Sequence, residues 1–232
     1  MLIGPQNLTL PVNHVRSRIR QAAAAAGRDP ATVTLVAVTK AQTAETIRLA
    51  ATAGVTDFGE NYVQEATAKM DRLADLPLRW HFIGGIQSNK TRAIAERFDW
   101  VHSIDRLSIA QRLSEQRPYH APPLSLCIQV ALVPEPTKGG VLPARLAEIA
   151  ARTADLPRVC LRGLMCVPPP QADAAAERRV FAGLRTLLEE LNASGLKLDT
   201  LSMGMSGDFE SAIAEGATMI RIGTALFGSR NA

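Results

Sequence analysis

The chain has 232 residues, of which 47% are apolar and 21% charged, and its 26 Lys and Arg against 22 Asp and Glu give a net charge of +4. This composition excludes a disordered, collagenous or fibrous chain and is ample for a sizeable core. The arginines are scattered and aromatic residues make up only 4%, so the sequence has neither the basic stripe nor the stacking rings of a nucleic-acid binder.

Short β-rich apolar runs alternate along the chain with longer stretches of helical period. A first helix is predicted over residues 12 to 26, with Gly27 as its stop signal. The run from 34 to 40 is apolar on both faces, as a parallel strand covered on both sides must be. Strands are predicted at 34–40, 57–61, 79–84, 100–104, 125–132, 159–166, 200–204 and 218–223, and helices between them at 43–53, 62–74, 89–97, 106–116, 143–153, 173–194 and 208–215.

Eight strand–helix units predict an α/β protein, a single (β/α)8 TIM barrel with an extra N-terminal helix. An open, doubly wound sheet is the alternative. No low-complexity linker divides the sequence, so residues 1–232 are expected to form one domain.

Cysteine usage and hydropathy indicate where the protein resides. Cys127, Cys160 and Cys166 form no CxxC motif and are odd in number, which predicts buried structural thiols in a reducing compartment. The four histidines are far apart in sequence, so no metal site is indicated. No apolar run approaches the ~18 residues that span a bilayer, and the stretch around Ala22 to Ala26 is too short and weakly apolar for a signal peptide. We expect a cytoplasmic protein.

Polar residues stand near the C-terminal ends of the predicted strands, where barrel proteins carry their sites. Lys40 closes the first strand, and alternation with Val36 and Val38 turns it toward the barrel interior. A lysine there is a candidate Schiff-base nucleophile, the alternative being a rim lysine that reaches into solvent. Asn61 ends the second strand and His81 lies in the third.

Two glycine turns follow the seventh and eighth predicted strands. The segment SMGMSGD (202–208) turns into a short helix, and the eighth strand ends in Arg221-Ile222-Gly223-Thr224. Free backbone N–H groups at such turns bind phosphate, and barrel phosphate sites recur at these two loops. Together with Lys40 they predict a phosphorylated carbonyl ligand. Arg221 should point inward, to meet either the phosphate or a pyridine nitrogen.

Seven sequence motifs are spread in order over nearly the whole chain. They are LVAVTK (35–40), DFGENYVQE (57–65), WHFIGGIQSNK (80–90), VHSID (101–105), LRGLMCVPPP (161–170), LSMGMSGDFESAI (201–213) and MIRIGTALFG (219–228). Together they resemble the pyridoxal phosphate homeostasis protein family (YggS/PROSC-like). The resemblance implies a barrel related to the alanine racemase N-terminal domain, with pyridoxal 5'-phosphate (PLP) held as a Schiff base on Lys40. It further implies phosphate contacts at Ser206, Gly207, Gly223 and Thr224, Arg221 near the pyridine nitrogen, and Asn61 and His81 lining the pocket.

Two departures from the family pattern do not touch these groups. Ala131 replaces a usual Asn, which affects the lining of the rim after the fifth strand, and Ile86 replaces a usual Leu. In the matching loop after that strand, Lys138 is either an alternative acceptor for the cofactor or a solvated loop lysine.

Three functions are compatible with these residues. A monomeric PLP-binding protein would buffer the cofactor and deliver it to apo-enzymes without turnover. A PLP-dependent racemase-like enzyme needs bases on both faces of the cofactor, but the chain offers only Tyr62 and Tyr119. A Schiff-base aldolase acting on a sugar phosphate would use the same lysine and phosphate turns. The resemblance favours the first.

Overall fold

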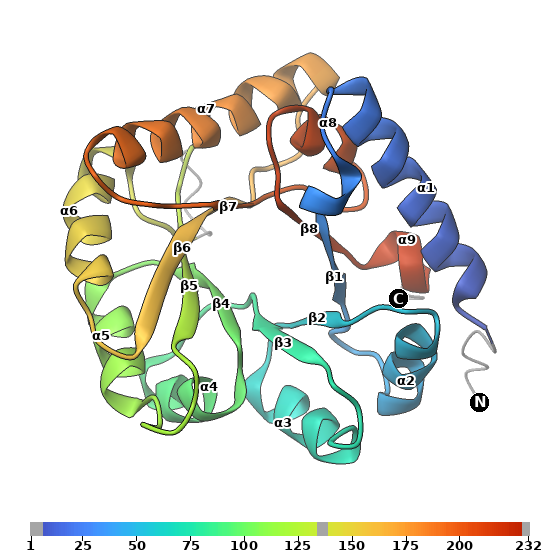
Figure 1. The fold of residues 1–232 in the computed structure, drawn as a ribbon, viewed down its shortest axis with the longest axis horizontal. Coiled ribbons are helices and arrows are strands. Elements are labelled where there is room, and N and C mark those ends of the chain that lie inside the picture. Colours follow the sequence, from blue (N-terminus) through green and yellow to red (C-terminus); the bar gives the residue numbers. More distant parts are fainter. Residues whose placement is uncertain (1–6, 134–138, 229–232) are drawn as a thin grey trace.

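Eight parallel strands close into a barrel in chain order, surrounded by a ring of helices (Figure 1). The computed structural model describes residues 7–133 and 139–228. The first and last strands pair in parallel, with Val36 beside Arg221, so the barrel prediction is confirmed over the open sheet. The strands are β1 (Thr34–Val38), β2 (Asp57–Glu60), β3 (Arg79–Phe82), β4 (Trp100–Ile104), β5 (Leu124–Gln129), β6 (Val159–Met165), β7 (Thr200–Ser202) and β8 (Met219–Ile222).

The N-terminal helix takes a place in the outer ring. The helix that follows β8 is only four residues long, and α1 packs against α8, α9 and α2 beside it (Figure 1). The extra N-terminal helix is therefore confirmed, and it covers the seam where β8 meets β1. The helices are α1 (Thr9–Ala25), α2 (Ala44–Thr52), α3 (Val63–Arg72), α4 (Thr91–Arg97), α5 (Leu107–Gln116), α6 (Pro143–Ala154), α7 (Ala174–Ala193), α8 (Phe209–Ala214) and α9 (Thr224–Phe227), with 3-10 turns at Pro30–Thr32 and Ser88–Lys90.

Side chains alternate along the strands between two cores. Ile220 and Ile222 of β8 pack in the large layer between barrel and helices, whereas Met219 joins a small interior cluster. Arg221, which lies between the two isoleucines in sequence, is buried and shares the interior side with Met219. The interior cluster consists of Val36, Trp100, Cys127, Met165 and Met219.

Strand ends and one cysteine differ from the sequence predictions. β1 and β7 end two residues before their predicted limits, and the chain turns shortly after each of them, where Ala41 and Gly204 adopt positive φ values of 61° and 92°. Cys127 and Cys166 are buried as predicted, but Cys160 is exposed. It lies near the start of β6 and alternates with Val159 and Leu161, which take the core positions.

Within residues 7–133 and 139–228, no helix has the length and apolar character needed to cross a membrane.

Candidate functional site

Lys40 lies at the C-terminal end of β1, in the turn after the strand. Val36 belongs to the barrel interior. Val38 lies beside Gly223, since a Cβ added to Gly223 would be 3.6 Å from the Val38 Cβ. Alternation therefore puts Lys40 on the interior side, above the seam between β1 and β8. The residue is half-buried, which leaves its side chain open to a ligand at this end of the barrel.

The turns after β7 and β8 lie side by side, as predicted. The Ala225 backbone N–H donates to Ser206 Oγ at 3.2 Å, which ties the start of α9 to the turn after β7. Gly204 O accepts from the Arg221 N–H at 3.0 Å. The space where a Gly207 Cβ would point is open, and the Ser206 and Gly207 N–H groups find no acceptor in the described part of the chain. These free donors form a cradle that suits a phosphate.

Arg221 is the cation beneath this cradle. It is only 4% exposed, and its two terminal nitrogens donate to Ser202 Oγ at 2.7 Å and to the Cys166 carbonyl at 2.8 Å. Desolvation by burial lowers the pKa of Arg221, but a guanidinium still keeps its proton in proteins. A pyridine nitrogen facing this group would accept a hydrogen bond and stay unprotonated.

A chain of hydrogen bonds crosses the barrel interior from Arg221 to Asp57. Ser202 Oγ lies 2.7 Å from His102 Nδ1, His102 Nε2 lies 2.9 Å from His81 Nδ1, and His81 Nε2 lies 3.0 Å from Asp57 Oδ1. Burial lowers the pKa of both histidines, so they are neutral. Burial alone would raise the pKa of Asp57, but hydrogen bonds from His81, Arg79 and Thr56 lower it to about 2.

The two ends of this chain set the direction of every hydrogen bond in it. Arg221 can only donate and the Asp57 carboxylate can only accept. Ser202 therefore accepts from Arg221 and donates to His102, which donates to His81, which donates to Asp57. Each neutral imidazole then carries its single proton on Nε2. These hydrogen bonds hold the Arg221 side chain in place, and no carboxylate of the described residues forms an ion pair with it.

Two predicted pocket residues lie apart from the phosphate cradle. His81 is fully buried in the barrel interior, and both its ring nitrogens are engaged by Asp57 and His102. Asn61 lines a hollow of about 240 Å³ with Gly84, Gly85 and other residues of the neighbouring loop, and its buried Oδ1 has no hydrogen-bond partner in the described residues. Asn61 thus offers an acceptor that has no partner among the described residues, while His81 has no exposed surface and would act on a ligand only through the residues that it contacts.

Two residues in the chain of hydrogen bonds that crosses the barrel interior were not predicted from the sequence. His102 and Ser202 are 100 residues apart, and only closure of the barrel brings them together. Their strand positions, each on the inward side of an expected strand, were the available signal. His81 and His102 meet although they are distant in sequence, yet the described residues contain no group of three metal-ligating side chains. Lys138 lies outside the described residues, and Ala131 is half-buried on the rim after β5.

The combined geometry fits a phosphorylated pyridine aldehyde. The cradle supplies N–H donors for a phosphate, Arg221 supplies a donor for a ring nitrogen, and Lys40 supplies an amine on the same end of the β1–β8 seam. The chemistry of this donor set, which is one amine, one guanidinium and backbone N–H groups without an acceptor among the described residues, matches the functional groups of PLP.

Comparisons with known proteins identify relatives over almost the whole chain. Residues 11–231 match the family described as alanine racemase, N-terminal domain. A pyridoxal phosphate homeostasis protein of Pseudomonas aeruginosa is 61% identical over 94% of this chain and 93% of its own length. The protein of the same name from Escherichia coli K12 is 48% identical, covering 94% of both chains. The structure of PipY from Synechococcus elongatus PCC7942 with PLP bound has a TM-score of 0.80 and 42% identity, over 91% of this chain and 100% of that one.

Proposed function

The chain belongs to the pyridoxal phosphate homeostasis protein family, and on this premise we propose that it binds PLP at the C-terminal mouth of the barrel and takes part in PLP homeostasis. Lys40 holds the cofactor as a Schiff base. Ser206, Gly207, Gly223 and Thr224 hold the phosphate. When bound, PLP supplies an electrophilic aldehyde, and exchange of its amine partner allows the protein to store and release it.

One observation carries this proposal: the turn with Lys40 and the two glycine turns meet at the seam between the first and last strands. Val38 packs beside Gly223, and Ser206 is bonded to the start of α9. Arg221 lies beneath them, paired in register with Val36. Asn61 offers from the rim an Oδ1 that has no hydrogen-bond partner within residues 7–133 and 139–228. His81 supports the site from below, through the chain of hydrogen bonds that ends at Arg221.

A carrier without turnover fits these residues better than a racemase. Racemisation needs a base on each face of the cofactor. Tyr62 and Tyr119 are 64% and 90% exposed, and the buried histidines have their ring nitrogens engaged with each other and with Asp57 and Ser202. We propose that the protein acts as a cytoplasmic monomer that buffers PLP and passes it to PLP-dependent apo-enzymes.

The test combines absorption spectroscopy with chemical trapping. PLP added to the purified protein should produce a visible band, and borohydride reduction followed by peptide mapping should place the adduct on Lys40. Lys40→Ala should lose both, whereas Lys197→Ala, which removes an exposed lysine, should keep both. An unchanged band in Lys40→Ala would overturn the Schiff-base role. Steady α-proton exchange of an amino acid in deuterated buffer, abolished in Lys40→Ala, would favour the racemase-like alternative.

A further inference from the structure

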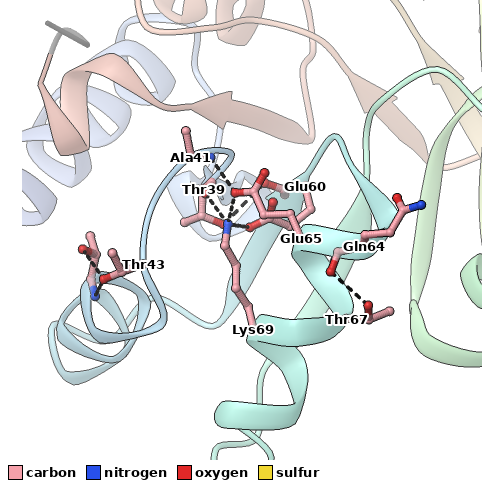
Figure 2. Close-up of polar contacts among 10 residues, drawn as sticks. Thr39, Ala41, Thr43, Glu60, Gln64, Glu65, Thr67 and Lys69 are labelled. Atoms are coloured by element: carbon pink, nitrogen blue, oxygen red, sulfur yellow. Dashed lines mark hydrogen bonds and ion pairs between the residues drawn. The ribbon is translucent and has the colours of Figure 1, made fainter.

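A buried ion cluster lies between α3 and the turn that holds Thr39 and Ala41, the two neighbours of Lys40 in the sequence (Figure 2). Its centre is Lys69, only 6% exposed. The Lys69 ammonium donates to Glu60 Oε1 at 2.8 Å, to Glu65 Oε1 at 2.6 Å and to the Thr39 carbonyl at 2.7 Å. These contacts use all three of its N–H donors, so Lys69 is held in one position and is not available as a nucleophile.

The cluster forms hydrogen bonds with the residue before Lys40 and with the residue after it. Before it, the Thr39 hydroxyl donates to Glu60 Oε1 at 2.6 Å, and the Thr39 carbonyl accepts from the ammonium. After it, the Ala41 N–H donates to Glu65 Oε1 at 2.6 Å. Figure 2 shows Thr39 bonded to Glu60 and Lys69, and Ala41 bonded to Glu65, which also accepts from the Lys69 ammonium. With its two neighbours tied on the helix side, Lys40 is left on the opposite side, toward the barrel mouth.

The backbone after Lys40 also needs this restraint. Ala41 has a φ of 61°, in the left-handed region that residues with a Cβ rarely adopt. Such a conformation persists only where the surroundings impose it, and it recurs at functional sites. A hydrogen bond from the Gln42 N–H to the Thr39 carbonyl, at 2.9 Å, closes this turn, and the hydrogen bond from the Ala41 N–H to Glu65 ties it to α3.

The cluster is costly as a means of stability alone. Glu60 is fully buried, one of its carboxylate oxygens has no partner among the described residues, and burial raises the pKa of Glu60. Apolar side chains of similar volume would hold α3 against β2 without burying these charges. What apolar groups could not do is hold the Thr39 carbonyl and the Ala41 N–H in fixed directions.

We propose that Lys69, acting through Glu60 and Glu65, is a positioning residue that sets the direction of the Lys40 amine. This inference rests on the proposed function, because it assigns Lys69 a role in presenting Lys40 to PLP. It also makes the two lysines distinct: Lys40 reacts, and Lys69 orients the turn that carries it.

The experiment compares Lys69→Met with Lys197→Met, which removes an exposed lysine. The first readout needs no cofactor: amide hydrogen exchange of Ala41 should become on the order of tenfold faster in Lys69→Met, since its acceptor Glu65 is no longer held. The second is the rate of borohydride-trapped PLP adduct at Lys40, which should fall on the order of tenfold, as expected for a displaced reacting group. Lys197→Met should match the wild type in both.

A second variant guards against loss of folding. Lys69→Met combined with Glu60→Gln removes both buried charges together and keeps a side chain that can bond to Thr39, so it should fold even where the single variant does not. It should still show fast Ala41 exchange and slow trapping. Wild-type rates in either folded variant would overturn the positioning role. Failure of the wild type itself to form an adduct on Lys40 would overturn the proposed function instead.

Discussion

Two glycines in the turn after β7 are required for different reasons. Gly204 has a φ of 92°, and an added Cβ would lie 2.7 Å from Ala212 Cβ and 3.0 Å from Phe209 Cα. That residue therefore lets the turn pack against α8. Gly207 has open space where a Cβ would point, and it belongs to the phosphate cradle. The first glycine serves the fold and the second serves the site.

Replacing each glycine by alanine should separate the two roles. Gly204→Ala should lower the free energy of unfolding by roughly 2–4 kcal/mol, from left-handed strain and overpacking. Gly207→Ala should leave that free energy nearly unchanged, because the added methyl group meets open space. In the cradle, however, the methyl group should disturb one hydrogen bond to the charged phosphate and so weaken PLP binding by about tenfold or more. Urea unfolding and PLP titration measure the two effects. Normal PLP affinity in Gly207→Ala would remove this residue from the cradle.

Lys40 and Lys69 show which single residues a sequence can reveal. Lys40 and Arg221 were predictable, because strand alternation and barrel closure are enough to place both near one mouth. Lys69 was not, because its burial depends on Thr39 and Glu60 from two other segments. The spacing of Glu65 and Lys69 allowed an ion pair on one helix face, but it does not distinguish a solvated pair from a buried one.

At the level of elements, the sequence located all eight strands and the main helices, but not how their interior side chains meet. The periodicity of 173–194 anticipated α7 within one residue at each end. It could not anticipate α9, because four residues contain barely one turn. The interior chain of hydrogen bonds joins β2, β3, β4, β7 and β8, so it exists only once the barrel has closed.

The chain of hydrogen bonds in the barrel interior predicts how the free energy of unfolding depends on pH. His102 is neutral in the folded protein because burial lowers its pKa well below 6.5, while the unfolded chain takes up a proton as the pH falls through that value. The contribution of neutral His102 to the free energy of unfolding is therefore present above pH 6.5 and is lost as the pH falls below that value. Between pH 6.5 and 5.5 the loss is about 1 kcal/mol of unfolding free energy.

The variant His102→Gln tests this dependence, since an amide can accept from Ser202 and donate to His81 without titrating. Urea unfolding at pH 7.5, 6.5 and 5.5 measures the free energy of unfolding. From pH 6.5 to pH 5.5 this free energy should fall by about 1 kcal/mol less in the variant than in the wild type. His120→Gln, at an exposed position, should decline like the wild type. The same decline in His102→Gln would mean that His102 accepts a proton inside the folded barrel, and the assigned direction of the chain would be wrong.

On the scale of the whole molecule, the proposed site joins the first and last strands of the barrel. Lys40 follows β1, Arg221 lies in β8, and α1 covers the outside of the seam between them. A ligand held by both strands closes a contact between segments about 180 residues apart in the chain. Binding should therefore stabilise the barrel as one unit, rather than order a single loop.

Thermal unfolding with and without PLP measures this coupling. At a PLP concentration one hundred times its Kd, binding to the folded state alone adds about 2.7 kcal/mol, which for a chain of this size raises Tm by roughly 5–10 °C. The transition should remain single, and amide exchange should slow in both β1 and β8. Lys40→Ala should reduce the shift at the same PLP concentration, because its affinity is lower. A PLP-dependent shift that is identical in Lys40→Ala, or protection limited to the turn after β7, would show that the cofactor does not bridge the seam.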